Sequence, residues 1–568
     1  MLETIRKRIY VAIVVLIMLT GTLVVRLVSL QFGVDTDYFA RLAESEHSTP
    51  REVFPPRGHI YDRNGVLLAT TRLEYEIGVS PVFIVDREGT ADALAAATKL
   101  PRDELLQTVS SPSSPYVLVQ RPAPPETGQQ LLAANLDGVS VVPIERRFYP
   151  HGTLAAQVVG FVGYDGLGYY GIEGFYDSEL RGEASMDDES RIPFDVGQRS
   201  APLSSTDLVL TIDSEIQYLT EQTLADAVAS TGAEGGTILV IDPKTGDILA
   251  MASLPTFDPN QFYDAPDSIL GNPAVSDQFE PGSIFKALTM AIALDQGVVA
   301  PDSTYVDNGV LEVGGREIYN WDRASHGVTT MTDLLGKSLN VGAATLSVTA
   351  GPTRFYAGLE AFGIGHPTGV DLQGEAPGQL RRPGDPEWHD SDLATNSFGQ
   401  GVAVTPLQMA VSISAIANRG LMMQPHVVYQ RSNEEGEMVA AQPSALGRAI
   451  SVQTAENLSE MMAQAVEREA SPALVPGYRI AGKTGTAEIP VPGGYHPEQT
   501  IATFVGFGPV DDPQFVILIK LDIPKTSRWG SETAAPVFSG FVQRLVVLME
   551  IPPDDLRQNI AFSQQVGG

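Results

Sequence analysis

The chain has 568 residues, with 37 Lys and Arg against 69 Asp and Glu, and so a net charge of −32. A surface this acidic repels a phosphate backbone, so we expect no nucleic-acid partner. Apolar residues make up 43% and charged residues 19%, which is ordinary globular usage and excludes a fibre or a disordered chain. At roughly 150 residues per domain, this length predicts two to four domains.

The composition also narrows the possible chemistry. The sequence contains no cysteine, which excludes thiol catalysis, disulfides and cysteine-ligated metals. Its eight histidines never stand four residues apart, and the metalloprotease pattern H-E-x-x-H does not occur. We therefore expect neither a metal site nor a cofactor.

The first apolar segment, residues 9–25, carries no charge, and the apolar residues just after Arg26 extend it to about the length that spans a bilayer. Arg6, Lys7 and Arg8 precede it, which by the positive-inside rule predicts a cytoplasmic N-terminus and an exported remainder. A cleaved signal peptide is the alternative, but no small-x-small cleavage pattern follows the run. We predict a stub and retained single-pass anchor over residues 1–32, in the cytoplasmic (inner) membrane.

The exported part divides into two regions. Residues 33–205 alternate short apolar runs with Pro and Gly turns, which predicts an elongated α+β region. The polar residues 181–206 indicate a boundary, although a surface hairpin has the same composition. In residues 206–568, strands at both ends predict an antiparallel sheet flanked by helices. Predicted turns at 243–246 and 511–513 join strand pairs, and helical periodicity covers 214–231 and 533–550.

Ser283 begins a strongly apolar helical segment, and Lys286 follows three residues later, on the same helix face. Burial would lower the pKa of this lysine from about 10.4, so that its amine could accept the serine proton. Serine at a helix start is also an ordinary N-cap, and S-x-x-K occurs about once by chance in a chain this long. This pair alone leaves both interpretations open.

Two further clusters follow along the chain. Ser338 and Asn340 place a hydroxyl and an amide two residues apart, which in isolation is equally typical of a surface turn or a helix cap. Lys483-Thr484-Gly485-Thr486 lies in a strand-like run, where a lysine on an edge strand commonly only prevents aggregation. Gly482 and Gly485 favour more than this, because residues without a side chain let another backbone approach closely.

The order S-x-x-K at 283, S-x-N at 338 and K-T-G at 483 resembles the motif set of the class B penicillin-binding proteins, monofunctional peptidoglycan D,D-transpeptidases. Leu339 replaces the Asp of the S-D-N form, and S-x-N is the looser version seen in penicillin-binding proteins. Segments such as PPRGHIYDRNGVLLA and FGQGVAVTPLQMA are also similar to the family, so the resemblance covers nearly the whole chain. We interpret Arg57-Gly58 and Asp62-Arg63-Asn64-Gly65 as architectural.

The resemblance implies a transmembrane helix, an α+β pedestal and a serine β-lactamase-like transpeptidase domain. It implies that Ser283 attacks the carbonyl between two D-alanines of a stem peptide and that Lys286 is its base. Ser338 and Lys483 would relay the proton to the leaving amine and position the substrate carboxylate. Asn340 would hold Lys286 and the donor peptide amide by hydrogen bonds.

The strand that carries Thr484, Gly485 and Thr486 would bind the extended substrate, and the N–H groups of Thr486 and Ser283 would form the oxyanion hole. The resemblance also implies β-lactams as covalent inhibitors and a membrane glycosyltransferase partner of the shape, elongation, division and sporulation type. The alternatives are a D,D-carboxypeptidase or β-lactamase that passes the acyl group to water, and a non-catalytic β-lactam sensor or scaffold. The anchor and pedestal disfavour the hydrolase, and the intact nucleophile and base disfavour the scaffold.

Overall fold

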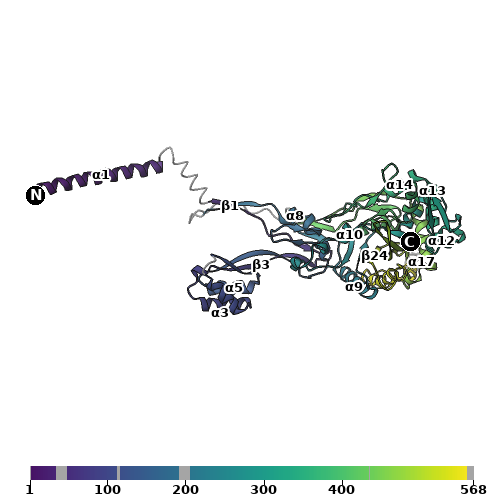
Figure 1. Ribbon diagram of the computed structural model, residues 1–568, viewed down its shortest axis with the longest axis horizontal. Coiled ribbons are helices and arrows are strands. Elements are labelled where there is room, and N and C mark those ends of the chain that lie inside the picture. The colour runs from purple at the N-terminus through teal and green to yellow at the C-terminus, as the bar shows by residue number, and fades with distance from the viewer. Residues whose placement is uncertain (1, 33–47, 112–114, 191–204, 434, 560–568) are drawn as a thin grey trace. The chain divides into compact units, whose positions relative to one another are not determined.

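The structure is a computed structural model, and it describes residues 2–32, 48–111, 115–190, 205–433 and 435–559 (Figure 1). The fold is α+β, as predicted. The chain separates into two compact units: Met1–Pro56 with Arg181–Ser205 form unit 1, and Arg57–Leu180 with Thr206–Gly568 form unit 2.

Unit 1 contains helix α1 (Leu2–Phe32), which includes the predicted apolar segment and extends it at both ends. Within α1, Arg6–Arg26 is long and apolar enough to cross a membrane, and its side chains are exposed. It is the one such helix among the described residues, and it fits a single-pass membrane protein. Strand β1 (Ser48–Val53) pairs antiparallel with β8 (Ser185–Ser190) in the predicted boundary stretch, of which residues 191–204 lie outside the description.

The first part of unit 2 is a small α+β layer with its own hydrophobic core. A long strand, β3, pairs antiparallel with β4 and with β5, and helix α5 packs on β3 beside α3 (Figure 1), while α4 packs against α3. The helix α3 begins where Asp86 accepts the N–H of Gly89, an N-cap that the apolar spacing of this segment alone did not reveal. The bounds are β3 (Leu67–Val79), α3 (Arg87–Thr98), α4 (Arg102–Ser110), β4 (Val117–Ala123), α5 (Pro125–Ala134) and β5 (Val139–Phe148).

A buried ionic cluster lies beneath this layer. Arg57 Nε donates to Glu173 at 2.7 Å and its Nη1 donates to Asp177 at 2.8 Å, while Arg147 Nε donates to the other oxygen of Glu173 at 2.6 Å. Two guanidinium groups are thus balanced by two carboxylates. The structure confirms the architectural interpretation of Arg57.

The two parts of unit 2 share one sheet. Strand β2 (Ile60–Tyr61) pairs with β3 on one side and, in parallel, with β9 (Leu208–Leu210) on the other, so that the strand order is β20-β19-β9-β2-β3-β4. Asp62 reinforces this connection, because it accepts the N–H groups of Asn64 and Val66 and that of Ser214 in the next helix. Strand β9, which was predicted to begin the C-terminal region, therefore belongs to a sheet that it shares with strands of the preceding region.

The second part of unit 2 is built on a five-stranded antiparallel sheet with the order β11-β10-β24-β23-β22. Both predicted turns are confirmed: the first joins β10 to β11 and the second joins β23 to β24. The two edges of this sheet are thus β11 and β22. The strands are β10 (Gly235–Ile241), β11 (Ile248–Leu254), β22 (Ala481–Val491), β23 (Gly494–Gly508) and β24 (Phe515–Asp522).

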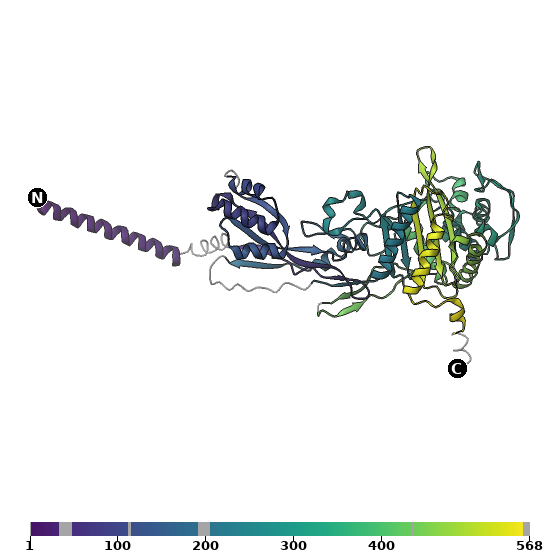
Figure 2. The same ribbon diagram turned by 90° about the horizontal axis from the view of Figure 1, so that it is seen from below.

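Helices cover both faces of this sheet, as predicted. Helices α9 (Ser214–Thr231) and α18 (Ala534–Leu548, yellow in Figure 2) pack on one face. Helix α16 (Pro406–Ala417) packs on the other face, and every one of its residues is buried. This burial explains why the helix is apolar on all sides. Helix α17 (Val452–Glu469) packs on β22 next to α16. The bounds of α9 agree with the predicted helix.

Shorter elements complete unit 2. They are η1 (Pro81–Phe83), α6 (Ala156–Val159), β6 (Phe161–Val162), β7 (Gly168–Tyr169), α7 (Gly171–Phe175), α8 (Asp177–Arg181), η2 (Pro259–Asp264), η3 (Asp267–Ile269), α10 (Pro273–Ser276), β12 (Thr304–Asp307), β13 (Val310–Val313), β14 (Arg316–Tyr319), β15 (Gly327–Thr330), α14 (Pro352–Ala361), β16 (Gln379–Leu380), α15 (Asp390–Asn396), β17 (Val402–Ala403), β18 (Leu421–Met423), β19 (Val428–Ser432), β20 (Met438–Ala440), β21 (Ala445–Arg448) and η5 (Ser471–Ala473). The remaining elements carry the site.

Candidate active site

Ser283 lies in a short turn, η4 (Gly282–Phe285), that leads directly into helix α11 (Lys286–Asp295). The turn requires glycine at 282, where φ is +57° and a Cβ atom would lie 3.0 Å from the carbonyl oxygen of Thr486. This close approach places the turn against strand β22. The Ser283 hydroxyl forms no capping hydrogen bond, so the N-cap interpretation is wrong.

Lys286 is the nearest group to this hydroxyl. Its Nζ lies 3.0 Å from Ser283 Oγ and donates to the carbonyl oxygen of Ser338 at 2.6 Å. The side chain is 1% exposed and forms no ion pair with a described residue. Burial, and then the positive charge of Lys483, hold the pKa of Lys286 well below its usual value, so the structure favours an uncharged amine beside the serine.

Ser338 connects the two lysines. It lies between helices α12 (Met331–Gly336) and α13 (Asn340–Ala350), and its φ is +59°, a left-handed conformation that is rare for a residue with a side chain. In this conformation its carbonyl faces Lys286, while its Oγ lies 3.1 Å from Lys286 Nζ and 3.1 Å from Lys483 Nζ. A hydroxyl between two amines can pass a proton from one to the other.

Lys483 projects from β22, which is an edge strand, as predicted. It is 3% exposed, and burial lowers its pKa to about 7. A Cβ atom at Gly485 would lie 2.2 Å from Thr503 Oγ1 and 2.9 Å from Ile284 Cγ2, so glycine allows β22 to approach both β23 and the nucleophile turn. A close approach at this glycine is therefore found, although the side chains of Thr503 and Ile284 make it and not another backbone.

The structure differs from the expectation for Asn340. Its Nδ2 donates to the carbonyl oxygen of Tyr319 at 3.0 Å. No hydrogen bond joins Asn340 to Lys286 in the described part of the chain, so this part of the prediction is wrong. Ser338 holds Lys286 instead: its carbonyl oxygen accepts a hydrogen bond from Lys286 Nζ at 2.6 Å, and its Oγ lies 3.1 Å from the same nitrogen.

A cleft of about 740 Å³ brings the three motifs together. Two aromatic residues that the sequence analysis did not identify also line it: Trp321 and Trp529 pack edge to face at 5.6 Å between ring centroids and are 58% and 37% exposed. The chain has only three tryptophans, so their rarity was the one available signal. The predicted residues that line the cleft are Ser283, Ser338, Asn340, Thr484, Gly485 and Thr486. Lys286 and Lys483 lie just beneath its surface.

This arrangement suits acyl transfer through a serine ester. The Ser283 hydroxyl lies within hydrogen-bond distance of the uncharged amine of Lys286. The Ser338 hydroxyl connects this amine to Lys483, a second lysine whose pKa is lowered. The free edge of β22 runs along the cleft and can pair with an extended peptide. The first turn of a helix also supplies N–H groups without intrahelical partners beside Ser283.

Comparison with known families covers most of the chain. Residues 236–543 match the family described as the penicillin binding protein transpeptidase domain, which is more than half of the chain. Residues 52–190 match the penicillin-binding protein dimerisation domain.

Individual relatives agree with these matches. Stage V sporulation protein D of Bacillus subtilis is 31% identical, with 97% of this chain and 87% of that protein aligned. The peptidoglycan D,D-transpeptidase FtsI of Escherichia coli is 30% identical over 89% of this chain and 86% of its own. The crystal structure of penicillin binding protein 3 from Mycobacterium tuberculosis in complex with aztreonam is 31% identical, with a TM-score of 0.70 over 89% of this chain and 98% of that one.

Proposed function

This chain belongs to the class B penicillin-binding proteins, the serine-type peptidoglycan D,D-transpeptidases of cell-wall synthesis, and we propose that Ser283 is its nucleophile. One observation carries the assignment: Ser283 Oγ lies 3.0 Å from the Nζ of a buried lysine that forms no ion pair with any residue the structure describes. Such an amine is the base that a serine needs to attack a carbonyl.

In the first half-reaction, Ser283 Oγ attacks the carbonyl carbon between the two D-alanines, and its proton passes to Lys286 Nζ. The new C–O bond replaces the C–N bond, and the terminal D-alanine leaves after its nitrogen receives a proton through Ser338 Oγ and Lys483. The distances of 3.1 Å on either side of Ser338 Oγ support this path.

In the second half-reaction, the amine of a neighbouring stem peptide attacks the ester carbonyl. It loses its proton to Lys286, and Ser283 leaves with a proton, so that an amide cross-link replaces the ester. The backbone N–H groups of Ser283 and Thr486 would stabilise the oxyanion in both steps, and each such donor contributes about 10² to 10³ in rate. Thr484, Gly485 and Thr486 would align the donor peptide along β22.

The Ser283→Ala variant tests this assignment. Intact mass after treatment with penicillin should show one adduct on the wild-type protein, mapped to the peptide with residue 283, and none on the variant. Ser531→Ala is a matched control, because Ser531 is another serine of the same cleft and makes no hydrogen bond to Lys286 among the described residues, and it should retain the adduct. An adduct that persists on Ser283→Ala would disprove the assignment. A stem-peptide assay for cross-linked dimer against free acid separates the transpeptidase from a hydrolase.

We assign residues 1–32 to a cytoplasmic stub and anchor, 33–205 to the pedestal and 206–568 to the transpeptidase domain. The apolar helix α1 and the basic residues Arg6, Lys7 and Arg8 before it support an exported catalytic domain. Because the chain has no cysteine, single cysteines introduced at Ser531 and Thr4 can be labelled selectively. An impermeant maleimide should reach only the first in intact spheroplasts; labelling of only the second would reverse the topology.

The same family membership supports a membrane glycosyltransferase partner of the shape, elongation, division and sporulation type, contacted through the anchor and the pedestal. Co-purification of the tagged full chain with such a glycosyltransferase tests this assignment. The test variant carries an unrelated single-pass helix in place of residues 1–32 and the pedestal of another family in place of residues 33–205. Co-purification of the glycosyltransferase with this variant should be lost.

A further inference from the structure

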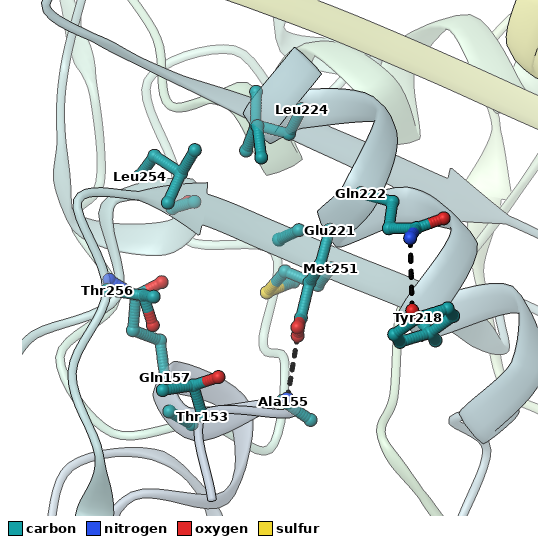
Figure 3. A pocket seen from close by; sticks show the side chains of 14 residues that line it. Thr153, Ala155, Gln157, Tyr218, Glu221, Gln222, Leu224, Met251, Leu254 and Thr256 are labelled. Atoms are coloured by element: carbon teal, nitrogen blue, oxygen red, sulfur yellow. Dashed lines mark hydrogen bonds between the residues drawn. The ribbon is translucent and has the colours of Figure 1, made fainter. Parts of the chain in front are cut away.

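A second cavity, of about 250 Å³, lies on the opposite edge of the five-stranded sheet from the active site (Figure 3). It is bounded by the middle of helix α9, by the edge strand β11 and by residues 153–157 from the first part of unit 2. Strands β10, β24 and β23 separate β11 from β22, so this cavity is distinct from the cleft that contains Ser283.

The walls of the cavity are mostly apolar. Its volume corresponds to about eight waters in the liquid, which is room for a compact organic molecule. Small ligands prefer such concave apolar sites when a few polar groups fix their orientation. The apolar lining residues are Ala155, Ala156, Leu224, Ala225, Met251, Ala252 and Leu254.

Glu221 supplies the one carboxylate of the lining, and no Lys, Arg or His is among the lining residues. Its Oε1 accepts two hydrogen bonds, from the Ala155 N–H at 2.8 Å (dashed in Figure 3) and from Gln217 Nε2 at 2.8 Å. Its Oε2 receives no hydrogen bond from any described residue. One oxygen of this acid is therefore available to a ligand.

Gln157 adds a second acceptor. The side chain is 5% exposed, and its Nε2 donates to the carbonyl oxygen of Pro255 at 3.1 Å, which fixes the amide. Its Oε1 accepts no hydrogen bond from the part of the chain that the structure describes. The cavity thus presents two acceptors, one of them acidic, to a ligand that donates.

The electrostatic surroundings of Glu221 point in the same direction. Burial raises the pKa of the Glu221 carboxyl, and only the neutral donors Gln217 and the Ala155 N–H oppose that rise. Glu221 is partly buried, a carboxylate without a cation is costly to desolvate, and a positive ligand would supply the missing charge.

We propose that this cavity is a ligand site for a compact organic ammonium cation, whose nitrogen donates to Glu221 Oε2 and Gln157 Oε1 while its apolar body fills the space between α9 and β11. The site joins residues 153–157 to the transpeptidase part, so the ligand also contacts both parts of unit 2.

Phenethylamine is a suitable probe, and 2-phenylethanol is its neutral counterpart of the same shape. Calorimetric titration of the full chain in detergent, corrected for the micelle blank, should show saturable one-to-one binding of the amine and at least about tenfold weaker binding of the alcohol. Treating the protein with penicillin first excludes the cleft, because the acyl group then occupies it. Binding to the treated protein should be unchanged, and binding that the treatment abolishes would overturn the proposal. The mass of the penicillin adduct reports on the proposed nucleophile separately.

Three variants sharpen the test. Glu221→Gln keeps the shape but removes the charge, and Ala225→Phe fills the exposed mouth of the cavity while the carboxylate stays; each should weaken amine binding about tenfold or more. Asp226→Asn is the matched control, since it removes one charge from the same helix outside the cavity, and it should bind normally. Equal binding of amine and alcohol, normal binding to both Glu221→Gln and Ala225→Phe, or no saturable binding to the wild-type protein would each overturn the proposal.

Discussion

Unit 2 buries two groups of cationic side chains, and the pKa is raised for an arginine of one group and lowered for the lysines of the other. In the pedestal, Arg57 and Arg147 lie against Glu173 and Asp177. Burial alone would lower the pKa of Arg57, but the two carboxylates outweigh it and raise that pKa. In the active site, the hydrogen bonds of Lys286 and Lys483 to described residues all go to hydroxyl and carbonyl oxygens, and burial lowers the pKa of both.

The difference teaches how to separate architecture from chemistry in this molecule. A buried cation that is matched by carboxylates is locked in one protonation state and holds structure together. A buried amine without a carboxylate can change its protonation state near neutral pH, which a general base requires. The predictions that follow alter one group at a time.

The largest effect should come from removing the base. Lys286→Met keeps the side-chain volume but deletes the amine, so acylation by penicillin should fall by about 10² to 10⁴. Because this lysine forms no ion pair within the described ranges, the thermal midpoint should stay the same or rise. Stopped-flow acylation and calorimetry measure both, with the exposed Lys525→Met as control. A drop in midpoint without a loss of rate would reverse the assignment.

Glu173→Ala should show the opposite pattern. The change leaves Arg57 and Arg147 buried without their shared carboxylate, which typically costs about 3–5 kcal/mol of stability. The thermal midpoint should fall, while each molecule that remains folded should be acylated at the normal rate. Glu145→Ala, on the exposed side of β5, is the control and should change neither quantity. A stable variant with slow acylation would contradict the division between the two groups.

Local patterns in the sequence were sufficient for much of this organisation. Helical periodicity predicted α9 within its observed bounds, and the Pro-Lys-Thr-Gly turn predicted the pairing of β10 with β11. The three motifs were sufficient to predict which residues meet in the cleft, because the resemblance carried long-range information that periodicity lacks. A close approach was rightly expected at Gly485, but side-chain atoms of Thr503 and Ile284 make it, and not another backbone.

Other features depend on contacts between distant segments and leave no local pattern. The parallel pairing of Ile60 with Leu208 joins strands far apart in the chain, so the two parts of unit 2 seemed more separate than they are. The left-handed conformation of Ser338, between α12 and α13, is rare for serine, so the residue type did not predict it. Glu221 meets Ala155 across two parts of the fold, and an isolated glutamate on a helix predicts only a solvated face.

The pH dependence of acylation should report both lysines. The rate should rise with pH as Lys286 loses its proton, at a pH well below the usual range of lysine, because only the neutral amine accepts a proton. Lys483 has a pKa of about 7, so it attracts a substrate carboxylate below this pH and loses that charge above it. The rate should therefore fall again around pH 7, by up to about tenfold per pH unit.

Acylation rates measured between pH 5 and 10 with benzylpenicillin and with its methyl ester separate the rise from the fall. The ester has no carboxylate, so its profile should keep the rise and lose the fall. Lys483→Met should likewise remove the fall with benzylpenicillin, although its rate is lower throughout. If the fall persists in Lys483→Met, the limb belongs to another group and the role of Lys483 in binding the carboxylate is wrong.

The smallest effect should come from an ion pair at the surface. It contrasts a solvent-exposed charge with the buried arginines and the buried lysines. Lys244 Nζ and Asp512 Oδ1 lie 2.6 Å apart and join the two hairpin turns of the central sheet, but the side chains are 44% and 61% exposed. Water and salt screen such a pair, so Lys244→Ala should lower the free energy of unfolding by less than about 1 kcal/mol. A double-mutant cycle with Asp512→Ala isolates the coupling, which should vanish in high salt. A coupling free energy between Lys244 and Asp512 as large as the stability lost in Glu173→Ala would contradict the role given to burial. An ion pair of the same short distance would then stabilise the protein equally at the surface and in the core.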